Sequence, residues 1–110
     1  MVIKITAEED ITIISFGGSL DTNTSKEAGD QLAKLVDDGK VKLIVDLTDL
    51  EYISSSGLRI LLATSKKLKP LKGEMLICGL NETVKEVFEI SGFTMIFKVL
   101  STLEEAKRSF

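Results

Sequence analysis

Apolar and polar residues alternate in short blocks along the chain, and the spacing of these blocks predicts strands and helices in turn. Ile3 and Ile5 alternate with polar neighbours, which is the period-two pattern of a half-buried strand. The isoleucine-rich segment 11–16 predicts a second strand, and the polar turn between the two predicts a hairpin. We expect Gly17 and Gly18 to end that second strand.

Four helices are predicted from apolar residues that recur at helical spacing. Residues 24–27 have the spacing of a capping box, in which a hydroxyl and a carboxylate satisfy free backbone N–H groups. Asn81 is a candidate N-cap for the third helix, and residues 101–105 predict a short terminal one. The residues expected to face inward from the first three helices are Ala28, Leu32, Leu35 and Val36; Leu58, Leu61, Leu62 and Leu68; and Val84, Val87 and Phe88.

Three further segments predict strands between these helices. Segment 41–47 contains the continuous apolar run Leu43–Val45, which is typical of a strand buried on both faces. Segment 74–78 predicts another buried strand, and segment 95–99 a short final one. Strands joined by helices run parallel with right-handed crossovers. The order therefore predicts an α/β fold: a mixed, mostly parallel sheet of about five strands, with about four helices packed on it.

Length and charge narrow the class of protein. The 110 residues suit a single domain over positions 1–110. A formal net charge of −3 disfavours nucleic acid and anionic membranes as partners, because both are bound chiefly through Lys and Arg. No segment approaches about 18 consecutive apolar residues, so no membrane span is predicted. The first residues lack a signal-peptide pattern and Cys78 has no second cysteine to pair with, so we expect a cytoplasmic location.

The chemistry available to the chain argues against an enzyme. The sequence has no histidine, which is the commonest general base and a common metal ligand. It also lacks a Gly-x-Ser-x-Gly nucleophile elbow and the glycine-rich motifs that cradle phosphates. Asp46 ends a buried strand, but no lysine follows the strand 74–78 as a phosphate-accepting receiver domain requires. We therefore expect no catalytic activity, no metal and no cofactor.

A run of three serines stands between a buried strand and an amphipathic helix. Ser54, Ser55 and Ser56 come directly before Gly57. Hydroxyls at this position can cap the helix, which is worth roughly 1 kcal/mol. They can also receive or bind a phosphate, which free N–H groups and the helix dipole favour. The residues alone favour capping, although three hydroxyls exceed what one cap requires.

The surrounding sequence resembles a known family. Segment 44–58 resembles the signature of STAS domains, specifically the anti-sigma factor antagonists, in which an Asp-Leu strand end is followed by Asp-Ser-Ser-Gly-Leu opening a helix. Residues 18–21, Gly-Ser-Leu-Asp, resemble the family's Gly-x-Leu-Asp after the second strand. Segments 72–76 and 84–93 also match the family pattern, so the resemblance covers essentially the whole chain.

This resemblance implies a bacterial regulator of transcription that works by partner switching. The unphosphorylated form of such a protein binds a serine kinase that doubles as an anti-sigma factor, and this frees a sigma factor. Phosphorylation switches binding off, and a PP2C-type phosphatase restores the active form. A STAS sensor or scaffold in a stress-signalling or lipid-transport complex is the alternative function.

The resemblance also implies roles for individual residues. The serine directly before the glycine, Ser56, is the expected site of phosphorylation. The expected partner-binding residues are Asp21, Ser54, Ser55, Gly57 and Arg59. Ser54 replaces the family's usual aspartate, which removes one acid and leaves three adjacent hydroxyls. Ser55, or even Ser54, is therefore an alternative acceptor, and Arg59 is alternatively a plain exposed helix residue.

Overall fold

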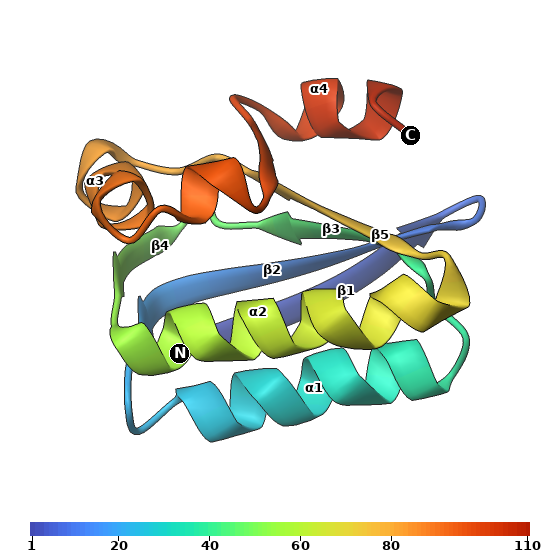
Figure 1. Cartoon of the computed structure of the whole chain (residues 1–110), viewed down its shortest axis with the longest axis horizontal. Helices are drawn as coiled ribbons and strands as arrows, with labels where there is room; N and C mark the ends of the chain where they lie inside the picture. The colour runs from blue at the N-terminus through green and yellow to red at the C-terminus, as the bar shows by residue number, and fades with distance from the viewer.

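The computed structural model describes residues 1–110 and contains a six-stranded sheet with four α-helices and two short 3₁₀ helices (Figure 1). The mixed α/β class predicted from the pattern is confirmed. In chain order the elements are β1 (Val2–Glu8), β2 (Ile11–Leu20), α1 (Ser25–Asp37), β3 (Lys42–Asp46), β4 (Leu50–Ile53), α2 (Ser55–Leu68), η1 (Lys69–Leu71), β5 (Glu74–Cys78), α3 (Glu82–Ile90), η2 (Phe93–Met95), β6 (Lys98–Leu100) and α4 (Leu103–Arg108).

The strand order explains where a functional site can form. Five strands follow the order β1-β2-β3-β5-β6, and β4 pairs with β2 off this path. The predicted hairpin is present, since β1 and β2 pair antiparallel from Val2 opposite Gly17 to Glu8 opposite Ile11. All the other strand pairs are parallel. The carboxyl ends of β2 to β6 therefore meet at one edge of the sheet, where ligand and partner sites of α/β folds form.

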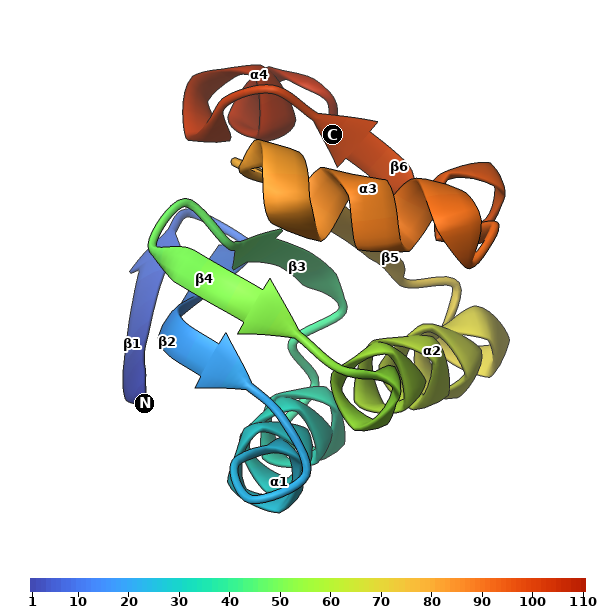
Figure 2. The same ribbon diagram turned by 90° about the vertical axis from the view of Figure 1, so that its left-hand side faces the viewer.

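Helices cover the sheet from both sides. Figure 2 shows α1 and α2 side by side on one side of the sheet and α4 on the other. The continuous run predicted to be buried on both faces, Leu43–Val45, is fully buried. Leu43 and Val45 pack into the larger apolar cluster with α1 and α2, while Ile44 packs into a smaller cluster with Ala106 of α4. An uninterrupted apolar strand is the consequence of covering both faces.

Most residues expected to face inward do so. All of those named for α1 are buried, as are Leu58, Leu61, Leu68, Val84 and Phe88. Leu62 and Val87 are only half-buried, because each lies at the margin of its helix's apolar stripe. The expected cap of α3 is present, with the Asn81 Oδ1 accepting a hydrogen bond from the Val84 N–H at 2.8 Å.

The expected end of the second strand at the glycine pair was wrong. β2 continues through Gly17 and Gly18 to Leu20. Gly18 has φ of +96°, and the register shifts between Gly18 and Ser19 as β2 leaves its earlier neighbours and pairs with β4. The glycine thus permits a bulge that redirects the strand, since only glycine adopts this φ without strain.

Two other strand predictions need correction. β4 was not predicted, because its burial runs in, out, out, in from Leu50 to Ile53 and lacks the alternation that signals a strand. The last strand was placed at 95–99, but β6 occupies Lys98–Leu100 and is preceded by the 3₁₀ helix η2. Met95 and Ile96 are 89% and 54% exposed, so their apolar character does not mark a buried strand.

The burial of the Cys78 thiol, in the smaller apolar cluster that contains Ile44 and Ala106, can be tested by the pH dependence of stability. Burial, with the nearby Asp46 carboxylate, raises the pKa of this fully buried thiol to about 12. An unfolded chain has a cysteine pKa of about 8.5, so the thiolate forms more readily once the chain unfolds. The protonated thiol therefore stabilises the fold fully below about pH 8.5, and this contribution is lost as the pH rises through about 12, by up to about 1.4 kcal/mol per unit.

We expect the free energy of unfolding in urea to fall more steeply with pH for the wild type than for Cys78→Ala between pH 8 and 11. Lysine and tyrosine titrations are shared by the two proteins and cancel in the difference. A difference that stays constant over this range would contradict the raised pKa.

Candidate functional site

The register of two strands brings Asp21 and the serine run to the same place. Ser19 pairs with Tyr52 and Leu20 with Ile53 in parallel. The pairing extends one step further, because the Ser54 N–H donates to the Leu20 carbonyl at 2.9 Å. β2 and β4 therefore end next to each other at the same edge of the sheet. From there, the segment after Asp21 leads into α1, and the segment after Ser54 leads into α2.

Ser54 is the N-cap of α2. Its backbone is extended (φ −97°, ψ 174°), and its Oγ accepts a hydrogen bond from the Gly57 N–H at 3.3 Å. Its carbonyl accepts the Leu58 N–H at 3.0 Å and so begins the helix. Capping, which the residues alone favoured, is therefore confirmed for this serine, and the cap does not use Ser55 or Ser56.

Ser55 and Ser56 occupy the first turn of α2, where backbone N–H groups lack partners within the helix. Ser55 is exposed and Ser56 half-buried. The Arg59 guanidinium, one turn along, donates from Nη2 to the Ser56 Oγ at 3.2 Å. No acidic residue lies in this first turn. The Ser56 hydroxyl is thus near a cation and the positive end of the helix dipole, a setting that tolerates an added negative charge.

Asp21 is fixed within its own turn. Its Oδ1 accepts hydrogen bonds from the backbone N–H groups of Asn23 and Thr24, at 2.9 and 3.1 Å. The Thr24 Oγ1 accepts from the Asp21 N–H at 2.9 Å and donates to the Ser19 carbonyl at 2.8 Å. These bonds hold the half-buried Asp21 at the end of β2 through its Oδ1 and its backbone N–H.

The capping box expected at residues 24–27 is not formed. Thr24 stands at the N-cap position of α1, but its side chain makes no cap hydrogen bond, because the Oγ1 is engaged with Ser19 and Asp21. The role of Thr24 in holding Asp21 was missed by the sequence analysis. The signal was present, since an aspartate three residues before a threonine is a spacing that closes such turns.

Gly57 lies where α2 approaches the end of β2 most closely. A β-carbon built at this position would lie 2.8 Å from the Ile53 Cγ1 and 2.9 Å from both the Leu20 Cγ and the Leu20 carbonyl oxygen. Such distances are well inside van der Waals contact. Only glycine therefore lets the first turn of α2 dock this closely against the ends of β2 and β4.

The other acids near this edge do not assemble a metal site. Asp46 uses its Oδ1 in its own turn, accepting from the Thr48 N–H at 3.0 Å and the Thr48 hydroxyl at 2.6 Å. Asp49 is exposed, and its carbonyl accepts the Gly18 N–H at 3.1 Å. No group of three or more His, Cys, Asp or Glu side chains is arranged to hold a metal ion. None of the helices has the length and apolar character needed to cross a membrane.

Comparison with known proteins identifies the family. The model of the STAS domain matches residues 2–106. BtrV of Bordetella bronchiseptica, provisionally named an anti-sigma factor antagonist, is 37% identical over an alignment of 110 positions that covers 98% of this chain and 95% of that protein. The crystal structure of an anti-sigma factor antagonist from Mycobacterium paratuberculosis has a TM-score of 0.91 at 23% identity, covering 98% of this chain and 92% of that one.

A third similar protein is SpoIIAA, a Bacillus cell fate determinant whose structure is known in its phosphorylated form. Its TM-score is 0.76 at 18% identity, and the match covers 99% of this chain and 100% of that one. At these sequence identities, the two solved structures show that the fold is shared. The family match spans nearly every element described above, and the chain therefore belongs to the STAS domain family.

Proposed function

We propose that this protein is an anti-sigma factor antagonist of the bacterial cytoplasm that is switched by phosphorylation of Ser56. The observation that carries the proposal is the hydroxyl of the half-buried Ser56, which lies in the first turn of α2, is not used by the helix cap and accepts a hydrogen bond from Arg59. The name of BtrV supports an antagonist function, and the phosphorylated form of SpoIIAA supports control by phosphate.

The contacts of the three serines favour Ser56 as the acceptor. The Ser54 oxygen is engaged with the Gly57 N–H, so that its phosphorylation would remove the cap of α2. Ser55 is exposed, but the Arg59 guanidinium donates its hydrogen bond to Ser56. A phosphate on Ser56 gains both the cation and the helix N-terminus, and it leaves the cap intact.

The effect of the phosphate follows from its charge. Phosphorylation adds about −1.5 to −2 charge at neutral pH. The helix dipole compensates by about 1 kcal/mol, so the domain keeps its fold. A partner carboxylate about 5 Å away is repelled by roughly 2 to 6 kcal/mol, for effective dielectric constants of about 80 to 20. Repulsion at the interface therefore exceeds stabilisation within the domain, and the partner dissociates.

The proposed partners are an anti-sigma factor kinase and a PP2C-type phosphatase that reverses the modification. Incubation with the cognate kinase and ATP, followed by mapping of the phosphate, tests the acceptor. We expect phosphate on Ser56 of the wild type, none on Ser56→Ala, and unchanged labelling of Ser55→Ala. A wild type that gains no phosphate and does not bind the kinase would leave the alternative function, a STAS sensor or scaffold.

Arg59 provides a separate prediction about the phosphorylated form. We expect Arg59→Ala to raise the second pKa of phosphoserine 56 by about half a unit, because the guanidinium favours the dianion. Titration by ³¹P NMR measures this pKa. Lys66→Ala is the matched control, since it removes the same charge from the last turn of the same helix. Equal pKa values in the wild type and Arg59→Ala would show that Arg59 does not contact the phosphate.

A further inference from the structure

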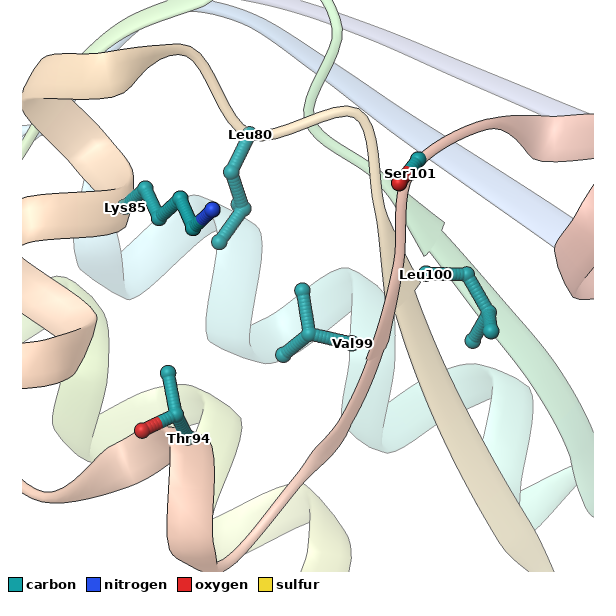
Figure 3. A pocket seen from close by; sticks show the side chains of 6 residues that line it. All are labelled: Leu80, Lys85, Thr94, Val99, Leu100 and Ser101. Atoms are coloured by element: carbon teal, nitrogen blue, oxygen red, sulfur yellow. The ribbon is translucent and has the colours of Figure 1, made fainter.

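A cavity of about 360 Å³ lies between α3, η2 and β6 (Figure 3). Its wall is formed by Leu80, Lys85, Thr94, Val99, Leu100 and Ser101. It opens at the carboxyl ends of β5 and β6, where α/β sheets bind ligands. Its volume is that of a small-ligand pocket, and none of its residues belongs to the proposed phosphorylation site.

The cavity combines an apolar floor with one cation. Figure 3 shows Lys85 extending from α3 towards Leu80, with Val99 below them and Thr94 at the far end. Lys85 is exposed and takes part in no ion pair, as is also true of Lys66 and Lys69. Glu82 and Glu89 stand three residues before and four after Lys85 on α3, and neither is bonded to it. The ammonium is therefore available to a ligand.

The combination of one lysine with apolar side chains indicates which class of ligand fits the cavity. A phosphate dianion is usually held by several backbone N–H groups or by arginine forks, and this cavity offers a single lysine. One ammonium matches one carboxylate, and Leu80 and Val99 match a short apolar chain. Thr94 limits the length of that chain at the other end.

We propose that the cavity binds a small monocarboxylate with a short aliphatic chain. The carboxylate contacts the Lys85 Nζ, and the chain lies over Leu80 and Val99 towards Thr94. This site is independent of the phosphorylation switch, so either proposal can fail without the other.

Titration of the ¹⁵N-labelled full chain with hexanoate, followed by NMR, tests the proposal. We expect saturable shifts confined to the amides of Leu80, Thr94, Val99 and their neighbours, with a millimolar dissociation constant. Lys85→Gln is expected to raise that constant about tenfold, and hexan-1-ol is expected to bind at least tenfold more weakly than hexanoate. Lys66→Gln, which removes an exposed lysine from α2, is the control and should bind as the wild type does.

A second variant tests the cavity itself. Thr94 is exposed, so Thr94→Phe is tolerated by the fold and fills the far end of the cavity, and it should abolish the hexanoate shifts. Shifts spread over the lysine-rich surface, equal binding of hexan-1-ol, or unchanged binding to Lys85→Gln would each overturn the proposal. Absence of any saturable shift would overturn it as well.

Discussion

Replacing Ser56 with aspartate is expected to weaken binding to the cognate anti-sigma factor kinase by about 4- to 300-fold. One carboxylate about 5 Å from a partner carboxylate costs roughly 0.8 to 3.3 kcal/mol for effective dielectric constants of 80 to 20. Full phosphorylation carries about twice this charge and should weaken binding by roughly 10- to 10⁴-fold. Isothermal titration calorimetry with the purified kinase measures both effects.

Two variants separate charge at this position from other causes. Ser56→Ala removes the hydroxyl without adding charge and should bind within a few-fold of the wild type. Ser65→Asp adds the same charge near the far end of α2 and should leave binding unchanged. If Ser56→Asp bound as tightly as Ser56→Ala, the proposed switch would be wrong. The effect should also shrink with salt, because the groups are partly exposed and are screened over about 8–10 Å.

The sequence alone predicts the parts of the fold that are governed by local pattern. The strand Glu74–Cys78 and the Asn81 cap of α3 were predicted at the residues where they occur. Both depend on residues that are close in sequence. The strand is recognised by its continuous apolar run, and the cap by an Asn side chain placed three residues before a backbone N–H that has no partner within the helix.

The parts that could not be predicted depend on contacts between distant segments. β4 exists because β2 bulges at Gly18 and pairs with it, and nothing in the four residues Leu50–Ile53 signals that partner. Thr24 fails to cap α1 because its hydroxyl is already bonded to the end of β2. In both cases a local preference yields to a tertiary contact that the pattern does not contain.

The departure from the family signature at Ser54 has a physical explanation. Serine and aspartate are both strong N-caps, and Ser54 makes the cap that an aspartate would make, to the Gly57 N–H. The substitution therefore preserves the start of α2 while removing a negative charge beside Ser56. A phosphate on Ser56 meets less repulsion within this domain than it would beside an aspartate, which makes the acceptor assignment compatible with the altered motif.

Gly57→Ala is expected to destabilise the protein by about 1–3 kcal/mol, and so to lower Tm by roughly 4–15 °C. The new methyl group would meet the Leu20 carbonyl oxygen at 2.9 Å, and a strand backbone cannot yield as a side chain can. Alanine gains up to about 1 kcal/mol of helix propensity over glycine, which offsets only part of this cost. Urea unfolding measures the change. The affinity for the kinase should fall as well, because the first turn of α2, which carries Ser56, must move away from the end of β2.

Gly29→Ala is the matched control, since Gly29 is also a helical glycine. Its new methyl group would meet only the Ile60 side chain, whose tip, the Cγ2, lies at 3.2 Å and whose Cβ lies at an ordinary contact distance of 3.5 Å. That tip can shift by a few tenths of an ångström, so the gain in helix propensity should dominate and leave stability equal or up to about 1 kcal/mol higher. The same chemical change should thus have opposite signs at the two sites. If Gly57→Ala were as stable as Gly29→Ala, the explanation would be wrong that position 57 requires glycine because α2 approaches Leu20 closely.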